Sequence, residues 1–400
     1  MNPNLARLQP YPFERLRALY EGIEPNTKLS PINLSIGEPK HATPAFIERT
    51  LADNLNGLSI YPPTLGSLEL REAIASWLVR RHGLATIDAT TQVLPVNGSR
   101  EALFAFAQAV IDPSRGEPFV ICPNPFYQIY EGSALLAGAA PYFVNMTAAN
   151  GFAADYQSVP EHVWKRTQLL YACSPSNPTG RVMNLDEWSR LFELSDRYGF
   201  VIASDECYSE LYFREDQPAL GALAAANRLG RGRFARLVVF SSLSKRSNVP
   251  GMRSGFVAGD AALLKSFLLY RTYHGSAMSP AVQAASAAAW KDETHVRENR
   301  RLYAEKFKAT LGLIEPPLAA AMPDGGFYYW MRTPMGATEF AGGLYRDCNV
   351  QVLPGSFLAR QAQGVNPGAG YIRVALVAPL AECIEAVERI NLFSRRLKSS

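Results

Sequence analysis

Short apolar runs alternate with helical segments through the first two thirds of the chain. Residues 119–122, 168–173 and 237–240 are almost wholly apolar and have the length of buried strands. Residues 101–110 and 188–198 instead carry apolar side chains at helical spacing. Strands that are buried on both faces and joined through helices form parallel sheets. The sequence therefore predicts an α/β fold with a mostly parallel sheet.

Polar and glycine residues stand where these predicted strands end. Gly98, Tyr127, Asn177, Asp205 and Lys245 each lie at or just past the C-terminal end of a strand. In an open α/β sheet, ligands bind in the crevice outside the carboxyl ends of the strands. These five residues therefore predict one binding site at that end of the sheet.

The segment 241–256 is the most informative of these strand ends. A lysine at the end of a buried strand loses solvation, so its neutral amine becomes accessible and can attack a carbonyl carbon. Ser242 and Ser244 flank Lys245, and Arg253 follows eight residues later. Hydroxyls and a guanidinium are suitable donors to a phosphate, so the segment predicts covalently bound pyridoxal phosphate. Taken alone, the segment also fits a surface loop with solvated cations.

Other strand-end residues supply the remaining contacts of such a cofactor. Asp205 can pair with the pyridine nitrogen and keep it protonated, because a buried carboxylate needs a cationic partner. Asn177 and Tyr208 can hydrogen-bond to the phenolic oxygen of the ring, and Tyr127 can stack on its face. For Asp205 the alternative is a helix N-cap or a structural ion pair.

A second phosphate-binding feature precedes the predicted helix 101–110. The strand 93–96 leads through Gly98, Ser99 and Arg100 into this helix, whose free N–H groups and dipole attract an anion. The turn has neither a Walker sequence nor the Rossmann glycine spacing. We expect the N–H groups of Ser99 and Arg100 to bind the cofactor phosphate.

Length and composition limit the other possibilities. The chain has 400 residues, 48% hydrophobic and 19% charged, with a net charge of +4, so we expect two globular domains without a nucleic-acid or membrane partner. Its five cysteines show no paired spacing, which argues against a disulfide framework and against a zinc site. Residues 1–12 lack the apolar core of a signal peptide, and no apolar run reaches transmembrane length. We expect a cytoplasmic protein.

The last third of the chain differs in character. Strands at 325–330, 350–353 and 371–376 and a helix at 380–393 follow a charged helix at 295–310, which predicts a smaller α+β domain. We predict three parts: an N-terminal arm with part of the small domain at 1–45, a large cofactor-binding domain at 46–285, and a small C-terminal domain at 286–400.

Several motifs give the chain a resemblance to a known family. They are residues 35–39 (SIGEP), Tyr61 with Gly66, 174–180 (SPSNPTG), 205–208 (DECY), 242–245 (SLSK) with Arg253, and 371–373 (YIR). In this order and spacing they resemble the class I and II aminotransferases of fold type I, over nearly the whole chain. The resemblance implies a large domain with a mostly parallel seven-stranded sheet, a smaller α+β domain, and pyridoxal 5'-phosphate as cofactor.

The same resemblance implies roles for individual residues. The catalytic residues would be Lys245, Asp205 and Tyr208. Arg373 would bind the substrate α-carboxylate, which suits the planar fork of a guanidinium, and Gly37 and Asn177 would add contacts there. Tyr61 would reach the phosphate bound by a second copy of the chain. The resemblance thus implies an obligate homodimer with composite active sites.

More narrowly, residues 10–14, 98–106, 123–132 and 270–278 are similar to those of the bacterial N-succinyldiaminopimelate aminotransferases. This implies transamination between glutamate and N-succinyl-2-amino-6-oxopimelate in lysine biosynthesis through diaminopimelate. Both substrates carry a distal carboxylate, for which Arg100, Arg271 and His274 are the candidate ligands, the last two from this chain or from a second copy of it. The alternative is that these side chains serve the dimer contact. A broad-range amino-acid aminotransferase and a pyridoxal-phosphate-dependent carbon–sulfur lyase are the alternatives, because they share the same lysine, aspartate and arginine.

Two functions of other classes are disfavoured. A regulator that binds its ligand through an aminotransferase-like domain needs a DNA-binding domain, and residues 1–30 are too short and too rich in proline for one. A dinucleotide-dependent dehydrogenase needs a glycine fingerprint after its first strand, and none follows there.

Overall fold

Seven strands form the central sheet of the molecule, which the computed structural model describes for residues 1–397. In their order across the sheet they are β2 (Val93–Val96), β8 (Gly255–Gly259), β7 (Leu237–Ser242), β6 (Val201–Asp205), β5 (Thr167–Cys173), β3 (Phe119–Asn124) and β4 (Ala140–Asn145). β8 runs antiparallel to both of its neighbours, β2 and β7, and the pairs from β7 to β4 are parallel. The prediction of an α/β fold with a mostly parallel seven-stranded sheet is confirmed.

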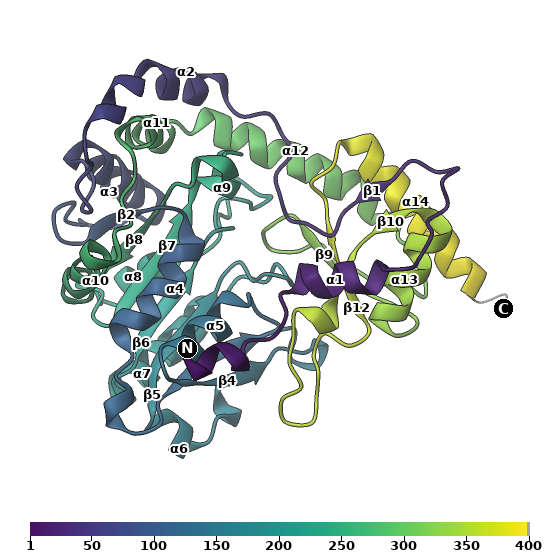
Figure 1. The fold of residues 1–400 in the computed structure, drawn as a ribbon, viewed down its shortest axis with the longest axis horizontal. Coiled ribbons are helices and arrows are strands. Elements are labelled where there is room, and N and C mark those ends of the chain that lie inside the picture. The colour runs from purple at the N-terminus through teal and green to yellow at the C-terminus, as the bar shows by residue number, and fades with distance from the viewer. Residues whose placement is uncertain (398–400) are drawn as a thin grey trace.

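Both faces of this sheet are buried, because successive side chains of a strand point to opposite sides. In β7, Leu237 and Val239 join one core, whereas Val238 and Phe240 join the other. The helices on one face are α4 (Ser99–Val110), α5 (Ile129–Leu136) and α10 (Ala261–His274); those on the other are α3 (Leu68–His82), α6 (Glu161–Trp164), α7 (Leu185–Tyr198), α8 (Ala222–Arg228) and α11 (Pro280–Lys291) (Figure 1). Burial on both faces explains why these strands are continuous apolar runs.

Helix α3 shows how local sequence sets the ends of an element. The Ser67 hydroxyl accepts a hydrogen bond from the Leu70 N–H, and Gly83 ends the helix in the left-handed conformation, with φ of 61°. Ile74 and Trp77 lie on its buried face. The bounds of α3 are therefore those that its caps dictate. α2 (Ala45–Asp53) packs outside this layer, against α11.

A smaller body forms around a second sheet in the C-terminal part of the chain. Its antiparallel strands are, in order, β11 (Leu353–Pro354), β12 (Tyr371–Ala375) and β9 (Tyr328–Arg332), and beside them β1 (Ile32–Asn33) pairs in parallel with β10 (Val350–Gln351). The helices α12 (Thr294–Leu311), α13 (Ala337–Cys348) and α14 (Leu380–Leu397) enclose the core of this body.

One strand prediction in this body is wrong. Residues 350–353 were expected to form a single strand, but Val352 separates β10 from β11, and the two belong to different sheets. The apolar pattern is continuous because Val350, Val352 and Leu353 are all buried. Their hydrogen-bond partners change from β1 to β12, and a burial pattern does not contain that information.

The two bodies lie side by side, and the N-terminal arm crosses between them (Figure 1). α12 extends from the large-sheet body into the smaller one (Figure 1). In the arm, α1 (Pro12–Tyr20) packs against α13, and the 3-10 helix η1 (Pro3–Arg7) packs against α5. The ranges given above for the domains stay predictions. Within residues 1–397, no helix is long and apolar enough to cross a bilayer.

Candidate active site

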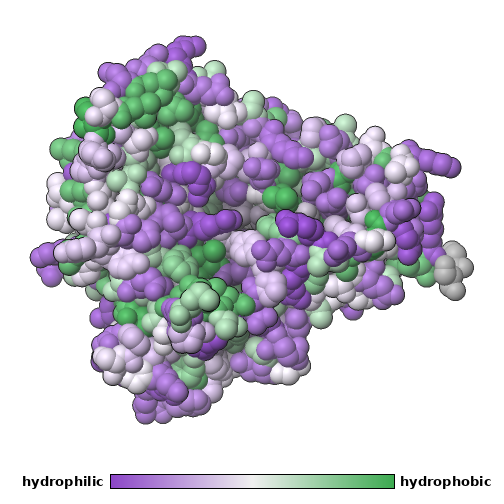
Figure 2. Space-filling view, in the orientation of Figure 1, coloured by the Kyte–Doolittle hydropathy of each residue, from purple (hydrophilic) through white to green (hydrophobic). Residues whose placement is uncertain are grey.

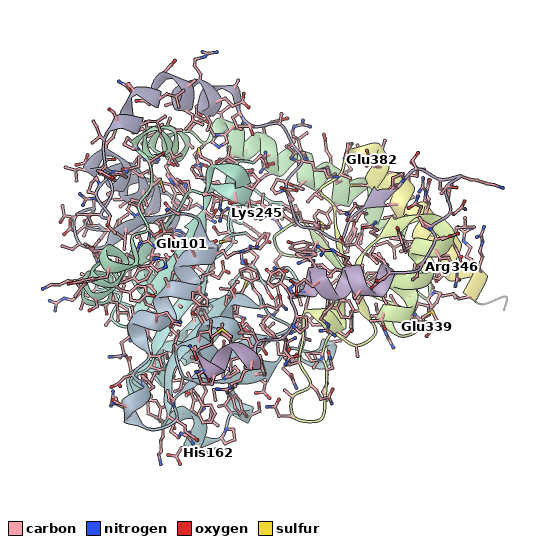
Figure 3. All side chains as sticks on the ribbon, in the orientation of Figure 1. Glu101, His162, Lys245, Glu339, Arg346 and Glu382 are labelled. Carbon is pink, nitrogen blue, oxygen red and sulfur yellow. The ribbon has the colours of Figure 1, made fainter. Side chains whose placement is uncertain are left out.

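A cavity of about 600 Å³ lies where the C-terminal ends of β5, β6 and β7 face the smaller body. The predicted site residues that line it are Gly37, Ser99, Arg100, Tyr127, Asn177, Asp205, Tyr208, Ser242, Ser244, Lys245, Arg253 and Arg373. Lys245 stands in the middle of the molecule, at the side of the large-sheet body that faces the smaller one (Figure 3). The structure thus brings residues from seven separate stretches of the chain into one cavity.

Lys245 lies in a one-turn helix, α9 (Leu243–Arg246), that directly follows β7. The Ser242 hydroxyl caps this turn by accepting a hydrogen bond from the Ser244 N–H at 3.0 Å. The Lys245 amine donates to the carbonyl oxygen of Gly37 at 2.5 Å. Burial is the main cause that lowers the pKa of Lys245 to about 8. Cys207 acts to raise this pKa, and Arg373 acts to lower it. A sizeable fraction of the amine is therefore neutral and nucleophilic near physiological pH.

Gly37 is required by its packing. A Cβ at this position would lie 2.0 Å from the hydroxyl oxygen of Tyr328 and 3.0 Å from the Phe327 ring. The hydroxyl of Tyr328 is itself in a 2.7 Å hydrogen bond with that of Tyr208. Only glycine allows the backbone to come this close to the two tyrosines while its carbonyl faces Lys245.

Asp205 ends β6 with a carboxylate that is only 6% exposed. The hydroxyl of Tyr130 donates to Oδ2 at 2.7 Å, and the Cys207 N–H donates to Oδ1 at 3.2 Å. Burial raises the pKa of Asp205, and these hydrogen bonds act against that rise. A buried carboxylate held by two donors is suited to pairing with one further cation in the cavity.

An anion cradle lies beside the lysine, at the N-terminus of α4. Gly98 precedes this helix with φ of 82°, and a Cβ there would lie 2.3 Å from the Arg253 guanidinium. The Ser99 hydroxyl accepts a hydrogen bond from the Cys207 thiol at 2.9 Å. The hydroxyl of Ser242 donates to that of Ser244 at 2.8 Å. Free helix N–H groups, hydroxyls and a guanidinium converge here, which suits a phosphate.

Arg373 reaches the cavity from β12 of the smaller body and is only 4% exposed. Its terminal nitrogens donate to the Asn177 side-chain oxygen at 3.0 Å and to the Ser35 carbonyl oxygen at 2.8 Å. Its guanidinium lies over the Tyr328 ring, 4.4 Å from the centroid. Among the described residues, its buried Nε atom has no hydrogen-bond partner.

At the open side of the cavity, Arg100 lies among aromatic rings. Its Nε atom donates to the hydroxyl of Tyr127 at 2.7 Å. Its guanidinium lies 5.8 Å from the ring centroid of Tyr11, which belongs to the N-terminal arm and also lines the cavity. The arm therefore contributes directly to the site.

Three of the expected side chains lie elsewhere in this chain. Tyr61 is fully exposed and does not line the cavity of its own chain. Arg271, a candidate for the distal carboxylate, is 1% exposed and forms a two-pronged ion pair with Glu101 at 2.8 and 2.9 Å. His274 lies outside the cavity, with its ring stacked on that of Tyr270. The expectation that Arg271 faces the cavity is wrong for its own chain.

Sequence reasoning missed four residues of the site: Tyr11, Tyr130, Cys207 and Tyr328. Tyr130 lies in the first turn of α5, three positions after Tyr127, and the two rings are in contact at 5.9 Å between centroids. Tyr328 begins β9, and its position opposite Gly37 depends on the packing of the two bodies.

A family model described as aminotransferase class I and II matches residues 30–390. The chain belongs to this family. It is similar to an aminotransferase from Neisseria meningitidis of known structure, with 52% sequence identity and a TM-score of 0.95, over 99% of this chain and 100% of that one. The LL-diaminopimelate aminotransferase of Aquifex aeolicus is 32% identical over 392 residues, 96% of each chain. The structure of a probable N-succinyldiaminopimelate aminotransferase from Thermus thermophilus has 27% identity and a TM-score of 0.85, over 96% of this chain and 100% of that one.

Class I and II aminotransferases depend on pyridoxal phosphate, so the chain is a pyridoxal-phosphate-dependent transferase of amino groups. The cavity fits this cofactor in three respects: an amine with a lowered pKa at Lys245, a buried carboxylate at Asp205, and an anion cradle at the N-terminus of α4. When bound, the cofactor withdraws electrons from the substrate Cα and so makes its proton acidic.

Proposed function

We propose that the enzyme transfers an amino group between glutamate and N-succinyl-2-amino-6-oxopimelate, a step of lysine biosynthesis through diaminopimelate. The observation that carries this proposal is that, besides Arg253 in the anion cradle, two further guanidinium groups line the cavity, Arg373 from β12 and Arg100 from α4. A substrate with a carboxylate at each end can bind both. The diaminopimelate-related names of the relatives from Aquifex aeolicus and Thermus thermophilus support the same substrate class.

In this proposal, the chain's own residues divide the work. Arg373 binds the α-carboxylate of the donor, and the Asn177 side chain holds the guanidinium in place. Lys245 attaches the cofactor in the resting enzyme, and its freed amine then removes the proton from the donor Cα and returns it during the transfer. Asp205 in its ionised form keeps the pyridine nitrogen protonated, while Tyr208 and Asn177 bind the phenolic oxygen. Ser99, Ser242 and Arg253 hold the phosphate.

Arg100 is the residue we assign to the distal carboxylate. One of its nitrogens binds Tyr127, and the other two have no hydrogen-bond partner among residues 1–397. Arg100 is exposed and lines the cavity, so these two nitrogens are available to the far end of a long substrate. Tyr11 covers the same guanidinium from the arm, and this contact limits its freedom.

The substrate experiment compares acceptors on the enzyme loaded with cofactor and glutamate. We expect N-succinyl-2-amino-6-oxopimelate to have a higher kcat/KM than oxaloacetate or pyruvate. Arg100→Gln should lower kcat/KM for this acceptor about ten- to a hundredfold, because a charge-assisted contact contributes about 1.5–3 kcal/mol. The exposed Arg233→Gln is the matched control, since it removes a guanidinium outside the cavity. Equal effects of the two variants would contradict the assignment of Arg100.

A second function, LL-diaminopimelate aminotransferase activity on the unsuccinylated acceptor, is favoured by the 32% identity to the Aquifex aeolicus relative. The two functions differ in whether the amino group of the acceptor carries a succinyl group. A higher kcat/KM for the unsuccinylated acceptor would select the second function. A preference for an aromatic amino acid, or cleavage of a sulfur amino acid, would select a broad-range aminotransferase or a carbon–sulfur lyase instead.

The role of Lys245 is tested by covalent attachment. After borohydride reduction of the loaded enzyme, we expect the cofactor mass on the peptide that contains Lys245. Lys245→Ala should bind cofactor without attachment and have negligible turnover. Attachment at another lysine would contradict the assignment.

We also propose that the active unit is a homodimer in which Tyr61 of one chain completes the site of the other. Leu58 and Ile60, at 67% and 66% exposure, adjoin the fully exposed Tyr61. Figure 2 shows an apolar area at the upper left of this face, where α11 lies in Figure 1. Exposed apolar side chains that gather in one region indicate a contact surface.

Mixed dimers test the shared site. Tyr61→Phe and Lys245→Ala chains, each weakly active alone, should recover activity when combined, because one site of the mixed dimer then carries neither change. Absence of recovery in a verified mixed dimer would contradict a shared site. Finally, we propose a cytoplasmic location, because all five cysteines are free.

A further inference from the structure

Asn299, in the first half of α12, lies directly behind the lysine of the active site. Its side chain is only 2% exposed. Its Nδ2 group donates to the main-chain carbonyl oxygens of Lys245 and Arg246, at 3.0 and 3.4 Å. Its Oδ1 atom accepts from the Asn248 side-chain amide at 3.0 Å and contacts Nδ1 of His41 at 2.9 Å. One amide group thus joins three segments of the chain.

These contacts fix the orientation of the amide and the tautomer of His41. Two carbonyl oxygens can accept only from the NH₂ group of Asn299, so its oxygen faces His41 and Asn248. His41 must then carry its proton on Nδ1, which leaves Nε2 as an acceptor. Lys306 lies 2.8 Å from Nε2 and also donates to the Val377 carbonyl oxygen at 3.3 Å. The donors and acceptors of Asn299, His41 and Lys306 are therefore mutually consistent.

The contacts of Asn299 and His41 reach both partners of the hydrogen bond between the Lys245 amine and the Gly37 carbonyl oxygen. On one side, Asn299 holds the main chain of Lys245. On the other side, His41 lies four residues after Gly37, whose carbonyl oxygen accepts from the Lys245 amine. The His41 ring also packs on Tyr303, at 4.5 Å between centroids. Both partners of the amine contact are thus tied to α12, the helix that extends into the smaller body.

We propose that Asn299 is a positioning residue of the enzyme, which sets where the Lys245 amine stands relative to the loop of Gly37. Asn299 touches neither substrate nor cofactor, and it acts through the main chain of Lys245 and the ring of His41. The proposal rests on Lys245 as the residue that attaches the cofactor. The chain carries no redundant donor for this task, because no other side chain of the described residues donates to the Lys245 carbonyl oxygen.

The test compares the loaded enzyme with its Asn299→Ala variant. The variant should still attach cofactor at Lys245, as seen by mass after borohydride reduction. Its kcat should fall about tenfold, while KM for glutamate stays within about threefold because Arg373 is intact. The pH midpoint of the cofactor absorbance should move by about half a unit or more, because a displaced Lys245 side chain stands at a different distance from the charge of Arg373.

The matched control is Asn391→Ala. Asn391 is 3% exposed and also binds main-chain groups, the Leu313 carbonyl oxygen at 2.6 Å and the Glu315 N–H at 3.1 Å, but it lies on α14, outside the cavity. It should lower Tm and leave kcat and the absorbance midpoint unchanged. Unchanged kcat and midpoint in Asn299→Ala, or equal shifts in both variants, would overturn the proposal.

A second variant reaches the same network from the other side. His41→Phe keeps a ring against Tyr303 and removes both nitrogen contacts. Its absorbance midpoint should shift in the same direction as that of Asn299→Ala, and an unshifted midpoint would overturn the proposal even if Asn299→Ala does not fold. If no attachment at Lys245 occurs in the wild-type enzyme, the assignment of the lysine fails instead, and this outcome is distinguishable from a failure of Asn299 alone.

Discussion

The hydrogen bond from Tyr130 to Asp205 gives a quantitative prediction for the variant Tyr130→Phe. Tyr130 is fully buried, and its hydroxyl donates to the Asp205 carboxylate at 2.7 Å. The phenylalanine variant keeps the ring in place and removes only this donor. The Cys207 N–H, at 3.2 Å from the other oxygen, remains.

The expected change in the pKa of Asp205 follows from the negative charge of its carboxylate, which accepts this hydrogen bond. A hydrogen bond to a charged group contributes about 1.5–3 kcal/mol, which corresponds to a rise of about 1–2 units in the pKa of Asp205. The pKa of Asp205 is already raised in the folded chain, so folding favours its protonated form, and stability falls as pH rises through the folded pKa. The cost of Tyr130→Phe is therefore largest at neutral pH, where an ionised Asp205 lacks its donor, and it shrinks as the pH falls.

Urea unfolding of the cofactor-free chain at several pH values measures this cost, and the pH profile of kcat/KM should show its acid limb about one unit higher. Tyr171→Phe is the matched control. Tyr171 is equally buried and stacks on Tyr130 at 4.6 Å, but its hydroxyl donates to the Leu103 carbonyl oxygen at 2.7 Å. Its cost should be about 0.5–1.5 kcal/mol and independent of pH. A pH-independent cost in Tyr130→Phe, or an unmoved acid limb, would refute the reasoning.

Three further predictions test other parts of the site. Gly37→Ala should destabilise the fold by about 1–3 kcal/mol in urea melts and reduce kcat/KM at least tenfold, because its methyl group would meet the Tyr328 hydroxyl. Gly232→Ala is the control, because Gly232 has open space around it, and it should change neither quantity. Arg271→Met should cost about 3–5 kcal/mol by leaving Glu101 unpaired, and the ratio of kcat/KM for glutamate to that for alanine should not change. The rate of cofactor attachment should rise with pH and level off above about 8, because the neutral Lys245 amine attacks; a rate that keeps rising up to about pH 10 would count against the lowered pKa.

The elements of the large sheet could be predicted from the sequence because each is defined by local information. Strands β3, β5 and β7 are buried on both faces, so their apolar runs have no competing explanation. β8 was not predicted, because glycines interrupt the apolar pattern in this part of the sequence. Gly255 and Gly259 are the first and last residues of the strand, and Gly251 lies in the turn before it. Its antiparallel direction depends on a tight connection from β7 through α9, which has no apolar signature.

The strand-end residues could be predicted because the order of the strands in the sheet determines which of these residues lie close together. Parallel strands that lie side by side in a sheet bring their carboxyl ends together, so Asn177, Asp205 and Lys245 meet whatever the details of packing. The motifs supplied the residue types, and the order β7-β6-β5 supplied their proximity. This is the part of the site for which a sequence pattern contains nearly all of the required information.

The rest of the site depends on how two separately folded bodies meet, and no local pattern encodes that contact. Tyr328 was identified only as part of a strand, yet its hydroxyl meets Tyr208 from the large-sheet body and excludes any side chain at position 37. Arg271 illustrates the converse error: a guanidinium in a family-like stretch was a candidate for the substrate, and the nearby Glu101 of α4 binds it instead. A charged side chain is free to bind a substrate only after the charges of its own fold are satisfied. Arg271 pairs with Glu101 and is not available, whereas no ion pair within residues 1–397 involves Arg373, which donates only to an amide oxygen and a carbonyl oxygen.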